Sequence, residues 1–131
     1  YHDASEILTG DLPTPIKYHN AEIMSAYHAV EDLAVQKLLG MLPPELRETY
    51  ADVLAEDKDG DIYPLVKAAD KLSAYIKCIE ERKAGNNEFL SAEAQTRAAL
   101  EASPLPEVQY FLEHFIPAFE RDLDELGAIG Q

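Results

Sequence analysis

Residues 21–38, AEIMSAYHAVEDLAVQKL, carry apolar side chains at the spacing of one face of an α-helix. These apolar positions are Ile23, Ala26, Tyr27, Val30, Leu33, Ala34 and Leu38. Gly40 and two prolines end the pattern, and Pro44 suits the first residue of a second helix, PELRETYADVLAE. The second helix is expected to face inward through Leu46, Tyr50, Val53 and Leu54. The stretch therefore predicts two successive amphipathic helices.

Helical spacing also marks the segments on either side. Before residue 21, the first nine residues read as helix, and Gly10, Pro13 and Pro15 then predict a short extended loop, GDLPTP. A helix over about 62–84 is predicted from the stripe Leu65, Ala69, Leu72, Ile76 and Ile79. A last helix, over about 107–126, is predicted from Val108, Phe111, Phe115, Phe119 and Leu123. No segment alternates like a strand, so the predicted fold class is all-α.

Composition limits the classes of partner. The chain has 131 residues, enough for one ordinary domain with a core. Its net charge of −14 argues against nucleic acid, because phosphate backbones are bound chiefly by Lys and Arg. A small phosphorylated substrate is compatible with that charge if a metal or a few cations offset the repulsion locally. No apolar run approaches the roughly 20 residues of a membrane span, so no membrane association is expected. The single cysteine, Cys78, cannot form an internal disulfide, which fits a cytoplasmic protein.

Ionisable side chains gather at the start of the chain. His2, Asp3 and Glu6 would converge on a helix, because residues three and four apart share a face. Imidazole and carboxylate are ligands for divalent metals. Exposed helices with Asp, Glu and His are also common, so these residues alone leave the metal site open. Asp70 interrupts the apolar stripe of its helix. Its position at the border of the apolar face fits a solvated carboxylate as well as a metal ligand.

Three motifs together carry a resemblance: HDASEILTGDLPTP from residue 2, KAADKLSAYIKC from residue 67, and AGNNEF from residue 84. With them the chain resembles, over essentially its whole length, the HD-domain phosphohydrolases, and most closely the bacterial 5'-deoxynucleotidases of the YfbR type. The resemblance implies an HD-domain helical bundle, with residues 1–131 as a single domain.

The resemblance also implies a site. His2, Asp3 and Asp70 match metal ligands for one divalent ion, such as cobalt or manganese. Glu6 matches the catalytic acid. The segment that binds the deoxyribose end of the nucleotide matches Asp11, Leu12, Pro13 and Thr14, and the ligands Asp3 and Asp70 are expected to contact the substrate as well.

One departure from the family pattern concerns the start of the chain. The family's first metal-binding His and an Arg-Trp pair that orients the phosphate lie upstream of the HD pair, outside residues 1–131. We therefore expect the chain to be the later part of the HD domain, starting at the HD motif. The alternative is a genuinely short protein with three of the four ligands.

By resemblance, the expected function is metal-dependent hydrolysis of deoxyribonucleoside 5'-monophosphates to deoxyribonucleoside and phosphate, by a homodimer. One alternative is an HD phosphohydrolase that acts on a cyclic or polyphosphorylated nucleotide. Another is an inactive metal-binding interaction module.

Overall fold

The computed structural model describes residues 1–131 except 18, 56–59, 123–124 and 126–131, and of 14 and 15 it describes the backbone alone. The described residues form α-helices and no strand, which confirms the predicted all-α class. In chain order the helices are α1 (Glu6–Thr9), α2 (Thr14–Lys17), α3 (Ala21–Met41), α4 (Pro44–Leu54), α5 (Tyr63–Lys83), α6 (Leu90–Glu101), α7 (Pro106–His114) and α8 (Ile116–Glu120). They divide into two compact units, Tyr1–Tyr63 and Pro64–Gln131.

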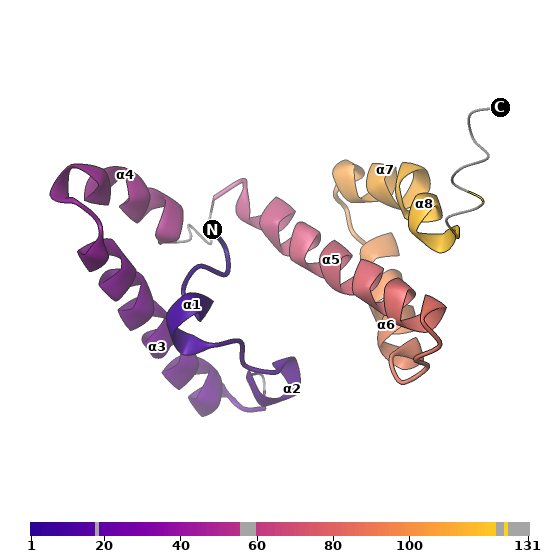
Figure 1. The fold of residues 1–131 in the computed structure, drawn as a ribbon, viewed down its shortest axis with the longest axis horizontal. Coiled ribbons are helices and arrows are strands. Elements are labelled where there is room, and N and C mark those ends of the chain that lie inside the picture. The colour runs from indigo at the N-terminus through magenta and orange to yellow at the C-terminus, as the bar shows by residue number, and fades with distance from the viewer. Residues whose placement is uncertain (18, 56–59, 123–124, 126–131) are drawn as a thin grey trace. The chain divides into compact units, whose positions relative to one another are not determined.

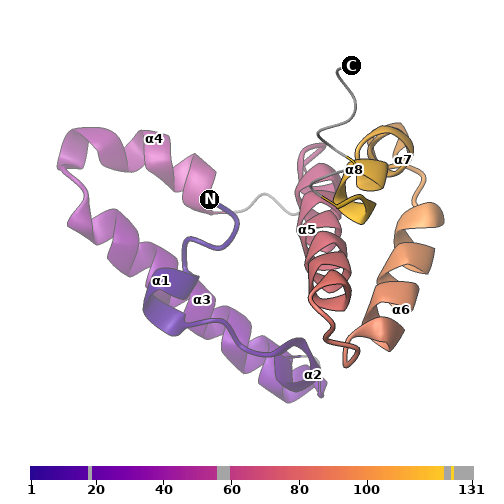
Figure 2. The same ribbon diagram turned by 45° about the vertical axis from the view of Figure 1, so that its right-hand side comes forward.

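The first unit is built on α3. Asn20 caps this helix, because its side-chain oxygen accepts a hydrogen bond of 2.8 Å from the backbone N–H of Ile23. The short helices α1 and α2 lie against α3, and α4 turns back from its C-terminal end (Figures 1 and 2). Pro44 begins α4 as predicted.

The second unit contains a small apolar core. Its buried members come from all four helices of the unit and are Leu72, Tyr75, Ile79, Leu100, Val108 and Ile116. Burial of an apolar side chain of this size contributes about 1.5–3 kcal/mol. Figure 1 shows α5 and α6 as a helical hairpin, with α7 and α8 following. The core therefore packs together helices that the sequence pattern predicts singly, without their contacts to one another.

A glycine follows the C-terminal end of α5. Gly85 has a φ of +86°, and its N–H donates to the carbonyl of Arg82 at 3.0 Å. The N–H of Asn86 donates to the carbonyl of Glu81 at 2.9 Å, which completes the paired bonds of a Schellman motif. The motif satisfies carbonyls that the helix end would otherwise leave without partners.

Two basic residues join the end of α5 to α6 and α8. Arg82 Nε donates to both carboxylate oxygens of Glu93, at 3.1 and 3.0 Å, and its Nη2 donates to Glu120 at 2.6 Å. Lys83 Nζ donates to the backbone carbonyls of Phe119, at 2.9 Å, and Arg121. These bonds add polar contacts between α5 and α8 to the apolar core that Ile116 of α8 shares with α5.

The structure differs from three expectations about helix bounds. The predicted helix 107–126 is divided, because α7 ends at His114 and α8 begins at Ile116; Pro117 cannot donate the N–H that a continuous helix needs. The predicted end at Leu126 lies outside the described residues. The extended loop is shorter than expected, since Thr14 begins the helical turn α2. Residues 2–5 form turns, and the α-helix itself starts at Glu6.

Burial also departs from the predicted faces. Leu65 and Ala69 of α5 are exposed, as are Val30 and Leu33 of α3. Tyr75, which was not in the predicted stripe, is 1% exposed. Helical spacing identifies a face, whereas burial depends on which elements pack against it.

Candidate active site

The adjacent His2 and Asp3 lie in the turn that precedes α1. His2 Nε2 is 3.7 Å from Asp3 Oδ1, and the His2 side chain is the more buried of the two. The Glu6 N–H donates to the Asp3 carbonyl at 3.0 Å, so the turn leads directly into the helix that carries Glu6. An imidazole and a carboxylate side by side fit a divalent transition metal by donor type.

Glu6 lies among other acidic groups. Burial raises the pKa of its carboxyl above the ordinary value of 4.5, and the charges of Asp3 and Asp11 raise it further. The ammonium of Lys17 lowers this pKa, and the charge of Glu31 raises it. The half-buried Glu6 is therefore better able to hold a proton than a solvated glutamate.

The loop after α1 carries the residues predicted to bind substrate. Gly10 ends α1 with a φ of +71°, and its N–H donates to the Glu6 carbonyl at 2.9 Å. Asp11 and Pro13 are exposed, and Leu12 is half-buried. The side chain of Thr14 lies outside the described residues. The Asp11 carboxylate is thus open to a ligand and acts electrostatically on Glu6.

Helix α3 contacts the chain on both sides of this loop, at Gly10 and at Lys17. Tyr27 donates its hydroxyl to the carbonyl of Gly10 at 3.0 Å. Glu31, one turn further along, accepts a hydrogen bond of 2.9 Å from Lys17 Nζ and lies 2.8 Å from His28 Nδ1. Lys17 Nζ also lies 4.6 Å from the centroid of the Tyr27 ring.

These roles of Lys17, Tyr27, His28 and Glu31 were not predicted from the sequence. Tyr27 was assigned only to an apolar stripe, although it is half-buried and donates its hydroxyl. The spacing of Tyr27 and Glu31, which share a helix face, was the one available signal. Their partners on the loop could not be read from spacing, because these contacts are tertiary.

Asp70 belongs to the second unit. It is exposed on α5, and its Oδ2 is 3.0 Å from Nζ of Lys67, one turn earlier. A metal that used Asp70 would therefore compete with this lysine. In the part of the chain that the structure describes, no three His, Cys, Asp or Glu side chains form a group ready to hold a metal ion. His2 and Asp3 therefore lie side by side in the first unit, whereas Asp70 is described by its contact with Lys67 in the second unit.

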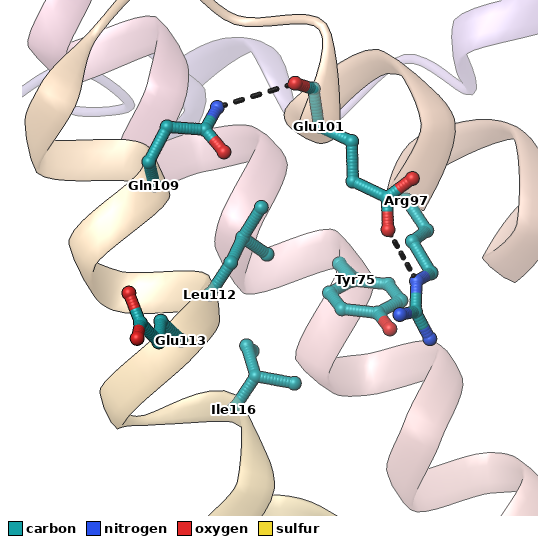
Figure 3. A pocket seen from close by; sticks show the side chains of 7 residues that line it. All are labelled: Tyr75, Arg97, Glu101, Gln109, Leu112, Glu113 and Ile116. Atoms are coloured by element: carbon teal, nitrogen blue, oxygen red, sulfur yellow. Dashed lines mark hydrogen bonds and ion pairs between the residues drawn. The ribbon is translucent and has the colours of Figure 1, made fainter.

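The second unit also contains a pocket of about 310 Å³ (Figure 3). It is lined by Tyr75, Arg97, Glu101, Gln109, Leu112, Glu113 and Ile116. Arg97 Nε donates to Glu101 at 2.8 Å, and Gln109 donates its amide to the backbone carbonyl of Ser103 at 3.0 Å. None of the residues predicted for the site lines this pocket.

Known proteins resemble the chain over nearly its full length. The model of the 5'-deoxynucleotidase YfbR-like family matches residues 1–119. A 5'-deoxynucleotidase YfbR of Shigella flexneri is 54% identical over 128 residues, which is 97% of this chain. The proteins of the same name from Escherichia coli strain K12 and Shigella boydii serotype 18 are 53% identical over 128 residues. The chain spans 64% of the length of these curated relatives. Among the described helices, none is both long and apolar enough to cross a membrane.

Proposed function

The chain belongs to the family of YfbR-like 5'-deoxynucleotidases, and on that premise we propose that it hydrolyses deoxyribonucleoside 5'-monophosphates to deoxyribonucleoside and phosphate. The observation that carries the proposal is the family match over residues 1–119, which include every residue predicted for the site. The proteins named 5'-deoxynucleotidase that match at 53–54% identity support it.

We propose that His2, Asp3 and Asp70 bind one divalent metal ion, such as cobalt or manganese. The donor types of the His2 and Asp3 pair fit such an ion. When bound, the ion supplies positive charge that offsets the charge of the phosphoryl group and activates water. The ligands themselves must be unprotonated, and the ammonium of Lys67 would compete with the metal for the Asp70 carboxylate.

Glu6 is proposed as the catalytic acid. Cleavage of the monoester leaves a developing charge on the 5'-oxygen of the sugar, and a proton delivered there stabilises the leaving group. The raised pKa of Glu6, caused first by burial, makes its carboxyl a better proton carrier than a solvated glutamate.

The loop segment Asp11, Leu12, Pro13 and Thr14 is proposed to hold the deoxyribose end of the nucleotide. The exposed carboxylate of Asp11 can accept a hydrogen bond from a sugar hydroxyl. Asp3 and Asp70 are proposed to contact the substrate through the phosphate end. We also propose, on the family resemblance, that the protein acts as a homodimer in the cytoplasm.

Phosphate release tests the proposed function. The purified protein is supplied with manganese or cobalt and given dAMP, AMP, a cyclic nucleotide and a nucleoside triphosphate in parallel. Release of phosphate from dAMP in preference to AMP supports the proposal. Turnover of only the cyclic or triphosphate substrate would assign the protein to another HD phosphohydrolase class, and metal binding with no turnover would indicate an interaction module.

A further inference from the structure

We propose that Tyr27 and Glu31 of α3 are positioning residues, which hold the chain on either side of the segment Asp11–Thr14, at Gly10 and at Lys17, and thereby sharpen its discrimination between deoxyribose and ribose. The proposal rests on the proposed function of that segment. Neither of these two side chains is proposed to contact the substrate.

The first end of the segment is held through Gly10. The Tyr27 hydroxyl donates to the Gly10 carbonyl at 3.0 Å. Gly10 has a φ of +71°, a conformation that L-residues rarely adopt, so this carbonyl points where few other residues could direct it. The N–H of the same glycine donates to the Glu6 carbonyl at 2.9 Å. Tyr27 therefore fixes the point at which the loop leaves the helix of Glu6.

The second end is held through Lys17. Lys17 Nζ donates to Glu31 Oε1 at 2.9 Å, and both side chains are only 21% exposed. The other oxygen of Glu31 lies 2.8 Å from His28 Nδ1, so both carboxylate oxygens have a partner and the side chain is fixed. Because Glu31 and the Tyr27 ring both engage its ammonium group, Lys17 serves here as a tether and is poorly placed to bind phosphate.

The two anchors act from one helix face. Residues one turn apart on a helix are neighbours, with about 5–6 Å between their Cβ atoms. Lys17 Nζ, 4.6 Å from the centroid of the Tyr27 ring, connects the two anchors directly. A loop fixed at both ends has less conformational entropy to lose when it binds a ligand, which is the general basis of preorganisation. Discrimination between two sugars that differ by one hydroxyl depends on such fixed geometry.

The test removes one anchor at a time. Tyr27→Phe deletes only the hydroxyl that bonds Gly10, and Glu31→Ala deletes the acceptor of Lys17. Loss of one hydrogen bond corresponds to about a 2- to 10-fold effect. We expect each variant to raise the KM for dAMP by about that factor and to lower the ratio of kcat/KM for dAMP to that for AMP, with kcat nearly unchanged in Tyr27→Phe. Glu31→Gln retains an oxygen that can accept from Lys17 and should recover part of the loss.

Tyr50→Phe is the matched control. It removes a hydroxyl from another tyrosine of the first unit, whose ring lies edge-on to that of Tyr1 with centroids 6.0 Å apart. This variant should keep the discrimination of the unaltered protein. If Tyr27→Phe left the sugar preference unchanged, or if it lowered kcat alone, the positioning role would be wrong.

Limited trypsin digestion separates this proposal from the proposed function. The anchors should protect the bond after Lys17, so Tyr27→Phe and Glu31→Ala should accelerate cleavage there by about 2- to 10-fold, whereas Tyr50→Phe should not. If the unaltered protein failed to hydrolyse dAMP, the proposed function would fail, and accelerated cleavage would still identify the anchors. Unchanged cleavage in both anchor variants would reject the tethering itself.

Discussion

At the scale of single residues, Glu6 has surroundings that separate it from an ordinary surface glutamate. It is half-buried, and burial together with the charges of Asp3 and Asp11 raises its pKa. Asp3 is exposed and lies beside His2, an arrangement suited to a ligand. Glu6 is therefore suited to carrying a proton, whereas the position of Asp3 beside His2 suits a metal ligand.

Replacement of Glu6 by Gln should distinguish these tasks. Gln keeps the size of the side chain but cannot deliver a proton, so we expect kcat to fall by about 100-fold or more while the bound metal is retained. Phosphate release and elemental analysis of the purified variant measure the two effects. Loss of metal in Glu6→Gln would mean that Glu6 is a ligand.

Asp70 and its neighbour Lys67 offer a second pair of variants. Asp70→Ala should lose bound metal and activity, because it removes a proposed ligand. Lys67→Gln, in contrast, removes the cation that lies 3.0 Å from the Asp70 carboxylate and should bind metal at least as tightly as the unaltered protein. Isothermal titration with manganese measures both affinities. Full metal affinity in Asp70→Ala would exclude this residue from the ligand set.

At the scale of helices, local sequence signals were sufficient to predict helix bounds that depend on local spacing and local turns. The spacing of apolar residues predicted a helix over about 62–84, and α5 spans Tyr63–Lys83. The predicted continuous helix over 107–126 was wrong at Phe115, where α7 ends and α8 begins at Ile116, because Pro117 lacks the N–H that a continuous helix needs. Packing was less predictable, since Leu65 lies on the apolar stripe and is nevertheless exposed.

The residues of the candidate site likewise divide into local pairs, which the sequence predicted, and tertiary contacts, which it did not. His2 and Asp3 are adjacent in sequence, so their pairing could be anticipated from the motif. Tyr27 and Glu31 contact Gly10 and Lys17, which lie far from them in the chain, and no periodic pattern reports a contact of that kind. What the sequence could not supply was therefore the tertiary support of the site.

Two glycines allow the helix assignments to be tested, because their substitution by alanine should change the stability of the protein in opposite directions. Outside their own chain neighbours and helix backbone, no described atom lies within 4 Å of the place where a Cβ would be added at Gly85 or Gly40. Gly85 has a φ of +86°, so Gly85→Ala should destabilise the protein by about 1–2 kcal/mol. Gly40 lies within α3, so Gly40→Ala should stabilise it by up to about 1 kcal/mol. Urea unfolding measures both changes, and a stabilising Gly85→Ala would contradict the assignment of the helix end.

At the scale of the whole molecule, net charge governs the approach of a substrate. The chain carries a net charge of −14, from 25 acidic and 11 basic residues, and a nucleoside monophosphate is itself an anion. Long-range repulsion should slow the encounter, and dissolved salt should relieve it. The acidic balance thus favours low affinity for polyanions and a substrate with few charges.

Salt dependence tests this effect. The Debye length shortens from about 30 Å at 0.01 M to about 8 Å at 0.15 M ionic strength, so kcat/KM for dAMP should rise by about 2-fold or more over that range. Because repulsion acts on the encounter, kcat at saturating dAMP should change little. A fall of kcat/KM with salt would show that local cations, and not the net charge, control the approach.

The bonds from Arg82 and Lys83 to α8 have a consequence for the spontaneous opening of the second unit. Glu120 accepts from Arg82 at 2.6 Å and the Phe119 carbonyl accepts from Lys83 at 2.9 Å, so α8 cannot separate without releasing the last turn of α5. The backbone amides of both segments should therefore exchange their hydrogens with deuterium at one common rate, as a single cooperative unit. Arg82→Gln should uncouple them, so that α8 exchanges faster while the buried turn around Ile79 keeps its protection.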